Sequence, residues 1–346
     1  MGRSSTPPRS SGSRRRQSLP RAAGSRRRRE RRGAMANAAR PAPEMAVAIG
    51  SLRMKNPVTT GSGTFGYGRE MAGMVDLSRL GALTVKTLQL TARPGNPSPR
   101  ICETPAGMIN SIGLPGVGID HFLAEELPFL RHCGPPVILS VAGCRVEEYV
   151  ALTRRADEAE GVAAVELNIS CPNVKQGGMA FSVDPAATAE VVAACRAATR
   201  KPLIAKLAPN VTSIAVIARA AEEAGADAIA AINTLQAMAI NVRTRRPRIA
   251  TNVGGLSGPA IRPIAVRLVW EIARAVRVPI IGMGGIQTAE DALEFILAGA
   301  TAVAVGTATF RNPGTVLEVI DGLQALVAEQ GVARVRDLIG AVEPWE

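Results

Sequence analysis

The stretch PIIGMGGIQTAEDALEFILAGATAVAVGTA, residues 279–308, contains one complete strand–helix–strand unit. Its two short apolar runs, 279–282 and 302–305, lack polar alternation, which is typical of parallel strands buried on both faces. Between them, Thr288 with Asp291 three residues later forms a capping box that predicts the start of a helix, and Gly299 predicts its end.

Runs of the same kind recur from about residue 45 onward, and helical patterns separate them. At Asp184-Pro185, a capping residue is followed by proline at the first helical position. Residues 260–276 show the apolar spacing of three and four that is typical of a helix. Eight alternations of strand and helix predict an α/β fold, a single parallel (β/α)8 TIM barrel. The first crossover, 87–136, is long, and we expect additional loop or hairpin structure there. The predicted strands are 57–60, 82–86, 137–141, 164–168, 203–207, 228–232, 279–282 and 302–305.

The net charge of +12 is confined to the beginning of the chain. Residues 1–40 carry 13 of the 41 basic residues and one of the 29 acidic residues, whereas residues 41–346 contain equal numbers of both. Arg, Ser, Pro and Gly dominate this segment, which therefore cannot bury enough apolar surface to fold. We expect residues 1–44 to be a disordered basic tail and residues 45–346 to form the barrel domain.

Three roles for the tail remain open from composition: a nucleic-acid or membrane-surface arm, a transit-like segment, or read-through upstream of a start at Met35 or Met45. The neutral remainder of the chain argues against nucleic acid as a partner, because phosphate contacts require a basic surface. No apolar region follows the charges, so a secretory signal peptide is not expected.

Neither a membrane span nor a disulfide framework is expected. The longest stretches without charged residues are 16 residues, at 104–119 and 295–310, short of the ~20 that a spanning helix needs. The five cysteines have no paired spacing, which suggests reduced thiols in a cytoplasmic enzyme and argues against an iron–sulfur cluster held by this chain alone.

Polar residues follow the predicted strands at their carboxyl ends, where the active site of this fold lies. Two lysines and two asparagines at one rim of an apolar barrel are better explained by function than by loop solvation. They are Lys86 (with Thr87) after the second strand, Asn168 after the fourth, Lys206 after the fifth and Asn233 (with Thr234) after the sixth.

Glycine clusters follow the last two strands, GMGGI at 282–286 and GTATF at 306–310, with GGLSG at 254–258 as a third. Bare backbone N–H groups at this place commonly bind phosphate, so the clusters predict a phosphorylated cofactor rather than simple turns. The pattern Gly61 to Gly66 also matches G-x-G-x-x-G. The continuing barrel pattern contradicts a dinucleotide fold, and a first loop close to a flat cofactor explains it better.

Cys171 is the candidate catalytic thiol, in the sequence NISCPN at 168–173. It lies among amides at the predicted barrel mouth, where a thiol can act as base or nucleophile. Cys195, inside a predicted helix, is interpreted as a buried structural thiol. His121 and His132 fall in the first crossover, away from the strand ends, and neither is expected to be the base.

From about Met45 to Ile339 the sequence resembles the dihydroorotate dehydrogenase family, in its class 1B catalytic-subunit form. The stretches that carry the resemblance are NPVTTGSGTFGYGRE (56–70), GNPSPRICETPAGMINSIGLPGVG (95–118), ELNISCPNVKQGG (166–178), INTLQAMAI (232–240), GGLSGPAIRP (254–263) and GMGGIQTAEDALEFILAGATAVAVGTA (282–308). It implies FMN as cofactor and oxidation of dihydroorotate to orotate in pyrimidine (UMP) biosynthesis. It also implies a partner subunit with FAD and an iron–sulfur cluster that passes electrons to NAD, and a homodimer within a heterotetramer.

The resemblance also assigns residues. Cys171 would be the base for the carbon-5 proton, with hydride transfer from carbon 6 to the flavin. Substrate contacts would come from Lys86, Asn110, Ser111, Ile112, Gly113, Leu114, Asn168, Asn233 and Thr234. Flavin contacts would come from Ser62, Lys86, Thr87, Asn168, Lys206, Ile232, Gly258, Gly284, Gly285, Gly306 and Thr307, together with Ser140, which stands where the family commonly has Asn.

Two rival functions are compatible with the same pattern. A related flavin barrel could act on another dihydropyrimidine or on dihydrouridine, and a non-redox phosphate-binding barrel could be an isomerase or aldolase. Flavin absorbance of the purified protein would separate the second rival from the flavoenzymes.

Overall fold

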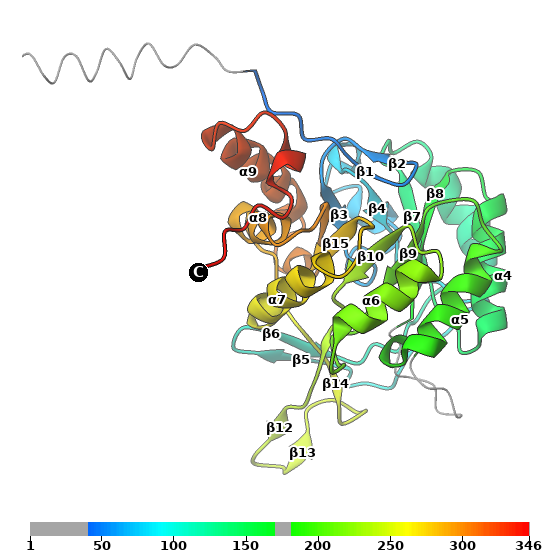
Figure 1. Cartoon of the computed structure of the whole chain (residues 1–346). Coiled ribbons are helices and arrows are strands. Elements are labelled where there is room, and N and C mark those ends of the chain that lie inside the picture. Colours follow the sequence, from blue (N-terminus) through cyan, green and yellow to red (C-terminus); the bar gives the residue numbers. More distant parts are fainter. Residues whose placement is uncertain (1–40, 170–180, 346) are drawn as a thin grey trace, which may run out of the picture. The chain divides into compact units, whose positions relative to one another are not determined.

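The computed structural model describes residues 41–169 and 181–345, and the barrel lies within the unit Ala42–Glu346. Eight strands form one sheet in which every ladder is parallel (Figure 1). All eight predicted strands are confirmed. In sheet order they are β3 (Val58–Thr60), β16 (Ala302–Val305), β15 (Ile280–Met283), β10 (Ala228–Ala231), β9 (Leu203–Lys206), β8 (Val162–Asn168), β7 (Val137–Val141) and β4 (Leu83–Thr84).

The barrel closes between β3 and β4 through threonine side chains. Thr60 Oγ1 donates to the carbonyl of Thr84 at 2.9 Å and accepts from the Thr84 N–H at 3.1 Å. The hydroxyls of Thr59 and Thr84 are 3.0 Å apart, and Gly81 N–H donates to the Val58 carbonyl at 3.0 Å. Side-chain bonds therefore supplement a few backbone bonds at this seam, where β3 and β4 form no continuous ladder. β4 is also shorter than the predicted strand 82–86.

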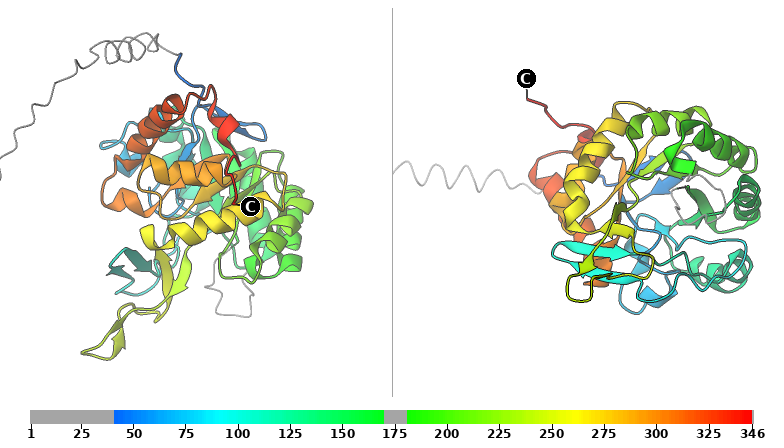
Figure 2. Two further views of the ribbon diagram at one scale, coloured as in Figure 1. Left: turned by 60° about the vertical axis from the view of Figure 1, so that its left-hand side comes forward. Right: turned by 90° about the horizontal axis from the view of Figure 1, so that it is seen from below.

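Helices surround the barrel (Figure 2), and the predicted caps are confirmed. Asp184 accepts from the Ala186 N–H at 2.8 Å, and Thr288 and Asp291 form a reciprocal capping box. The main helices are α4 (Val146–Glu158), α5 (Pro185–Arg196), α6 (Ile214–Glu223), α7 (Arg262–Ala273), α8 (Ala289–Leu297) and α9 (Thr315–Glu329). Shorter turns are η1 (Arg69–Met71), η2 (Leu77–Arg79), α2 (Ile119–His121), η3 (Phe122–Glu126), α3 (Leu127–Leu130), η4 (Phe181–Val183), η5 (Pro259–Ile261), η6 (Thr307–Phe310) and η7 (Val335–Leu338).

A four-stranded antiparallel sheet lies beside the opening of the barrel (Figures 1 and 2). Its order is β11 (Leu235–Ala237), β14 (Gly254–Ser257), β6 (Gly107–Asn110) and β5 (Ile101–Thr104). The hairpin expected in the first crossover is confirmed as β5–β6. Its pairing with β14 was not predicted, because the two strands are far apart in the chain. Two small hairpins complete the strands: β1 (Val47–Ile49) with β2 (Leu52–Met54), and β12 (Ile240–Asn241) with β13 (Arg246–Pro247).

The predicted tail falls almost wholly outside the described residues, which begin at residue 41. Glu44 already pairs with the end of the chain, because its N–H donates to the Ala333 carbonyl and its carbonyl accepts from the Val335 N–H, both at 2.9 Å. Within the described ranges, no helix combines the length and apolar character needed to cross a bilayer.

Replacing Thr60 by valine should open the seam between β3 and β4. Valine fills the same volume but leaves the buried Thr84 backbone groups without their partner, which costs roughly 1–3 kcal/mol. Urea denaturation followed by circular dichroism measures the free energy of unfolding. Thr60→Ser keeps the hydroxyl and should be the more stable variant; equal losses in both variants would show that the hydroxyl is not what closes the barrel.

Candidate active site

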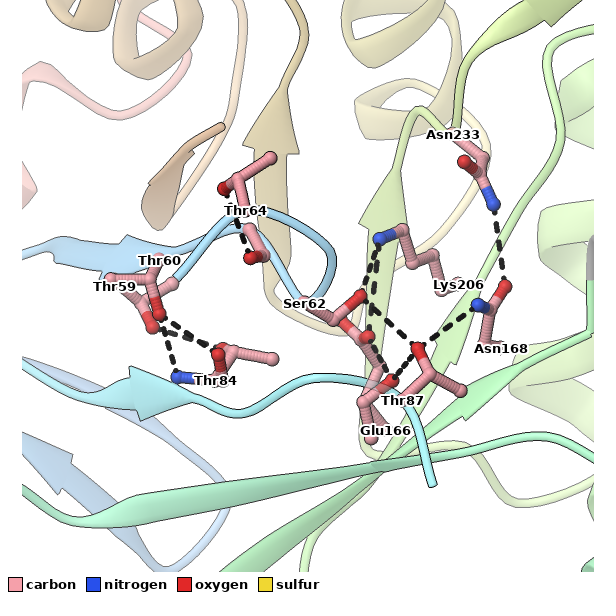
Figure 3. A network of polar contacts seen from close by, with 12 residues as sticks. Thr59, Thr60, Ser62, Thr64, Thr84, Thr87, Glu166, Asn168, Lys206 and Asn233 are labelled. Atoms are coloured by element: carbon pink, nitrogen blue, oxygen red, sulfur yellow. Dashed lines mark hydrogen bonds and ion pairs between the residues drawn. The ribbon is translucent and has the colours of Figure 1, made fainter. Parts of the chain in front are cut away.

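Polar side chains from five strand ends meet inside the mouth of the barrel (Figure 3). Lys206 Nζ, at the end of β9, donates to Ser62 Oγ at 3.1 Å. Asn168, its register partner at the end of β8, donates through Nδ2 to Thr87 Oγ1 at 3.2 Å. Asn233 Nδ2 donates to Asn168 Oδ1 at 3.3 Å. The structure therefore brings together residues that the sequence spreads between positions 62 and 233.

A buried carboxylate that the sequence analysis missed lies within this network. Glu166 is 2% exposed, accepts from Ser140 Oγ at 2.8 Å, and lies 4.0 Å from Lys206 Nζ. Ser140 in turn bonds Thr87 Oγ1 at 2.9 Å. The available signal was one acid inside the apolar strand AVELN, two residues before Asn168 and hence on the same face. Glutamate is almost never fully buried unless it is paired.

Lys86 supplies a second cation at the mouth, half-buried after β4. Burial lowers the pKa of its ammonium group below the ordinary value, because desolvation disfavours the charged form. The carboxylate of Glu70 opposes this shift, while Arg100 adds to it. The backbone is fixed by a bond from Lys86 N–H to the Gly66 carbonyl at 2.9 Å. A partly desolvated lysine of this kind is a strong partner for an anionic group.

The glycine loops after β15 and β16 present unbonded backbone donors. Within the described residues, the N–H groups of Gly284, Gly285, Gly306 and Thr307 make no hydrogen bond. Gly284 and Gly285 have φ of +133° and +82°, and a Cβ on Gly285 would lie 2.7 Å from the carbonyl oxygen of Gly258. Free backbone donors of this kind, on two adjacent strand ends, are typical of anion-binding loops.

The glycine pattern 61–66 has a structural explanation in the barrel. Gly61 follows β3, and its N–H donates to the Val305 carbonyl at 2.8 Å. A Cβ at Gly61 would lie 3.2 Å from Gly306 Cα, so a side chain would push the two loops apart. Gly61 therefore serves the close packing of the first and last strand ends, and its place after a barrel strand agrees with the rejection of a dinucleotide fold.

The stretch 110–114 reaches the mouth on the antiparallel sheet. Asn110 Nδ2 donates to the Gly255 carbonyl at 3.3 Å, and a Cβ on Gly255 would lie 2.0 Å from Thr234 Oγ1. Asn96, which the sequence analysis did not single out, donates through Nδ2 to the Ser111 carbonyl at 2.9 Å. Its N–H donates to the Ile112 carbonyl at 3.0 Å, so Asn96 fixes this loop.

Two further positions connect the sheets. Thr307 Oγ1 donates to Ser257 Oγ at 2.8 Å, which joins the last barrel strand to the end of β14. Ile232 is buried, its N–H donates to the Met283 carbonyl at 3.0 Å, and it packs beneath Gly284. These contacts connect the strand ends after β10, β15 and β16 with the end of β14.

Comparison with known proteins identifies the family of the chain. The family model for dihydroorotate dehydrogenase matches residues 44–327. The chain belongs to the dihydroorotate dehydrogenase family. This membership excludes the isomerase or aldolase barrel left open by the sequence, because the members of the family are flavin-dependent oxidoreductases.

Curated relatives match nearly their whole length. The chain is 57% identical over 301 residues to a protein of Pelobacter propionicus and 58% identical over 301 residues to one of Trichlorobacter lovleyi, in each case 87% of this chain and 99% of the relative. A protein of Desulforamulus reducens is 54% identical over 297 residues, 86% of this chain and 98% of the relative. All three are named dihydroorotate dehydrogenase B (NAD(+)), catalytic subunit.

The predicted base, Cys171, lies outside the described residues, between 169 and 181. The residues that flank this gap are well anchored: the Asn168 carbonyl accepts from Tyr149 Oη at 2.8 Å, and Ser182 N–H donates to the Ile169 carbonyl at 3.2 Å. Cys195 is fully buried in α5, and burial raises the pKa of its thiol to about 11. The interpretation of Cys195 as a structural thiol is confirmed.

Substituting Gly285 by alanine should weaken flavin binding by the dihydroorotate dehydrogenase site. The left-handed backbone and the carbonyl of Gly258 leave no room for a Cβ. If the loop moves to relieve strain of roughly 1–3 kcal/mol, the affinity for flavin should fall about 5- to 150-fold. Flavin content after purification and titration of the apoprotein measure the effect. Gly73→Ala, where a Cβ meets nothing within 4 Å, is the control. If Gly285→Ala binds flavin with the wild-type affinity, the glycine loops are not part of the cofactor site.

Proposed function

We propose that this chain is an FMN-dependent dehydrogenase that oxidises (S)-dihydroorotate to orotate in pyrimidine (UMP) biosynthesis. One observation carries the proposal: in a member of this family, Lys206, Asn168 and Asn233 converge beside a rim of free backbone donors. Such a site offers a cation, amides and an anion cradle within one barrel mouth. Bound flavin would supply the hydride acceptor.

The rim residues fit the two ends of FMN. The free N–H groups of the two glycine loops suit its phosphate, which is an anion with several acceptor oxygens. The side chains of Lys206 and Ser62 would face the ring, where preorganised positive charge favours the reduced state. The remaining proposed contacts are Lys86, Thr87, Ser140, Asn168, Ile232 and Gly258.

The amide side chains suit a pyrimidine substrate. An asparagine offers both donors and an acceptor, as do the ring amides of dihydroorotate. Asn233 already donates a hydrogen bond to Asn168. Asn110 donates to the Gly255 carbonyl, and Thr234 lies against the same glycine. Lys86 would bind the substrate carboxylate, while the loop Ser111, Ile112, Gly113 and Leu114 would close over the ring.

Cys171 would remove the proton from carbon 5 of the substrate. Its proximity to the substrate follows from its place three residues after Asn168, and a thiol takes a proton only as the thiolate. Cys171 would thus hold the proton from carbon 5, and bound flavin would supply the acceptor for the hydride from carbon 6.

Electrons would leave through a separate protein. The relatives' name, catalytic subunit, implies a second subunit in those enzymes. For this chain we propose a partner that carries FAD and an iron–sulfur cluster, in a heterotetramer built on a homodimer. The four free cysteines among the described residues suit a reducing, cytoplasmic location.

One experiment tests the central proposal. Purified protein should be yellow, and anaerobic addition of dihydroorotate should bleach its flavin absorbance while orotate forms. Dihydrouridine and dihydrouracil serve as competing substrates. If the bound flavin is bleached only by dihydrouridine or dihydrouracil, the protein is instead a flavin enzyme for another dihydropyrimidine.

Cys171→Ala should reduce its flavin far more slowly while it still binds FMN and orotate. General-base catalysis typically contributes ~10²–10⁴-fold, so a loss in this range is expected. The wild-type rate should rise with pH until the thiolate predominates, since a free thiol has a pKa of about 8.5. Anaerobic stopped flow across pH measures both. A mutant as fast as wild type would assign proton removal to another group.

The isolated chain should reduce artificial dye acceptors but not NAD. Its cysteine spacing offers no iron–sulfur ligand set, and its fold offers no second nucleotide domain in the described residues. Turnover with dihydroorotate is measured by dye bleaching and, in parallel, by NADH absorbance. Comparable rates with NAD and with the dye would disprove the need for a partner subunit.

A further inference from the structure

Glu166 is a buried charge for which the proposed reaction has no use. It is 2% exposed and the Lys206 residue beside it is 6% exposed, so both ionisable groups are removed from water. Isolated charges in such a place are costly, and pairing with further hydrogen bonds is what makes them tolerable. A packing residue here would be apolar, as Ala164 is, two residues earlier on the same face of β8.

The contacts of Glu166 point toward the site. Register places Ser140 beside Glu166 in the β7–β8 ladder, and Ser140 Oγ donates to Glu166 Oε1 at 2.8 Å. The same oxygen lies 4.0 Å from Lys206 Nζ, whose hydrogen bond goes to Ser62 Oγ at 3.1 Å. Lys206 Nζ therefore contacts both the buried carboxylate of Glu166 and the hydroxyl of Ser62 (Figure 3).

We propose that Glu166 is a positioning residue: it holds the Lys206 ammonium against Ser62 and cancels its charge, and so sets the reduction potential of the bound flavin. This inference rests on the proposed function, because it requires FMN at the rim. It assigns a role to a side chain that touches neither flavin nor substrate.

The direction of the effect follows from charge balance. Dihydroorotate gives one proton to the base and one hydride, two electrons and a proton, to the flavin, which gains one negative charge. With Lys206 and Glu166 both ionised, the pair is neutral before this step and leaves the new charge uncompensated. Without the carboxylate, Lys206 alone balances the reduced flavin. Glu166 therefore keeps the potential low, which favours onward transfer of electrons from the reduced flavin.

Glu166→Gln tests the charge with little change of shape, since the amide oxygen can still accept from Ser140. We expect the reduction equilibrium of the bound flavin to shift toward the reduced form by at least about tenfold, which is about 30 mV upward for a two-electron couple. Potentials are measured by anaerobic equilibration with reference dyes, and FMN affinity is measured separately. An unchanged or lowered potential in a variant that binds FMN would overturn the proposal.

Two further variants separate charge from structure. Lys206→Met leaves the Glu166 carboxylate without its cation and should lower the potential of the bound flavin. This variant keeps the test available if Glu166→Gln does not fold. An unchanged or raised potential would contradict the proposal. Ser140→Ala removes the hydrogen bond but not the charge, so a shift as large as that of Glu166→Gln would assign the effect to geometry and overturn the charge argument.

Asp157→Asn is the control for loss of a hydrogen-bonded carboxylate far from the site, although Asp157 is more exposed than Glu166. This carboxylate accepts from Thr199 Oγ1 at 2.6 Å before the start of β9, at the opposite end of the barrel. It should lower stability without moving the potential, and a shift equal to that of Glu166→Gln would mean that the readout follows stability alone. If the wild-type protein binds no FMN, the proposed function fails first, which is a different result from a flavoprotein whose potential ignores Glu166.

Discussion

Closure of an all-parallel sheet is the constraint on which the rest of this protein depends. Parallel strands deliver every carboxyl end to the same rim, so residues that directly follow the strands become neighbours whatever their distance in sequence. Here the last seam is made by Thr60 and Thr84 side chains rather than by a full ladder. That seam fixes the loop holding Ser62 next to the loop holding Thr87, whose N–H donates to the Ser62 carbonyl at 3.2 Å.

Buried polar groups are concentrated at the mouth of the barrel, and their removal from water costs folding free energy. Buried ion pairs contribute little net stability, because desolvation offsets their attraction. The Lys206–Glu166 pair is therefore better understood as part of a preorganised site than as a fold stabiliser. The apolar lower parts of β8, β9 and β10, fully buried around it, supply the driving force that keeps such a pair in place.

The antiparallel sheet gives the barrel a second wall. Its strands come from two different crossovers, and β14 connects them by pairing with β6 on one side and β11 on the other. Asn110 donates to the carbonyl of Gly255, and Thr234 occupies the space that a side chain on Gly255 would fill. The rim and the sheet are joined again by the Thr307–Ser257 bond.

The sequence by itself determined the eight strands, the order of strands and helices, the caps at Asp184 and Thr288, and the polar character of the strand ends. These depend on local patterns: apolar runs, capping chemistry and glycine position. The family motifs likewise assigned Cys171 its role, which the described residues leave as a proposal. Tertiary structure alone decided the pairing of β6 with β14, the anchoring of the 110–114 loop by Asn96, and the contact of Glu166 with Lys206. Each of these contacts joins residues that are not neighbours in the chain. The register between neighbouring strands selects the partners of β6 and Glu166, and a single strand does not encode that register.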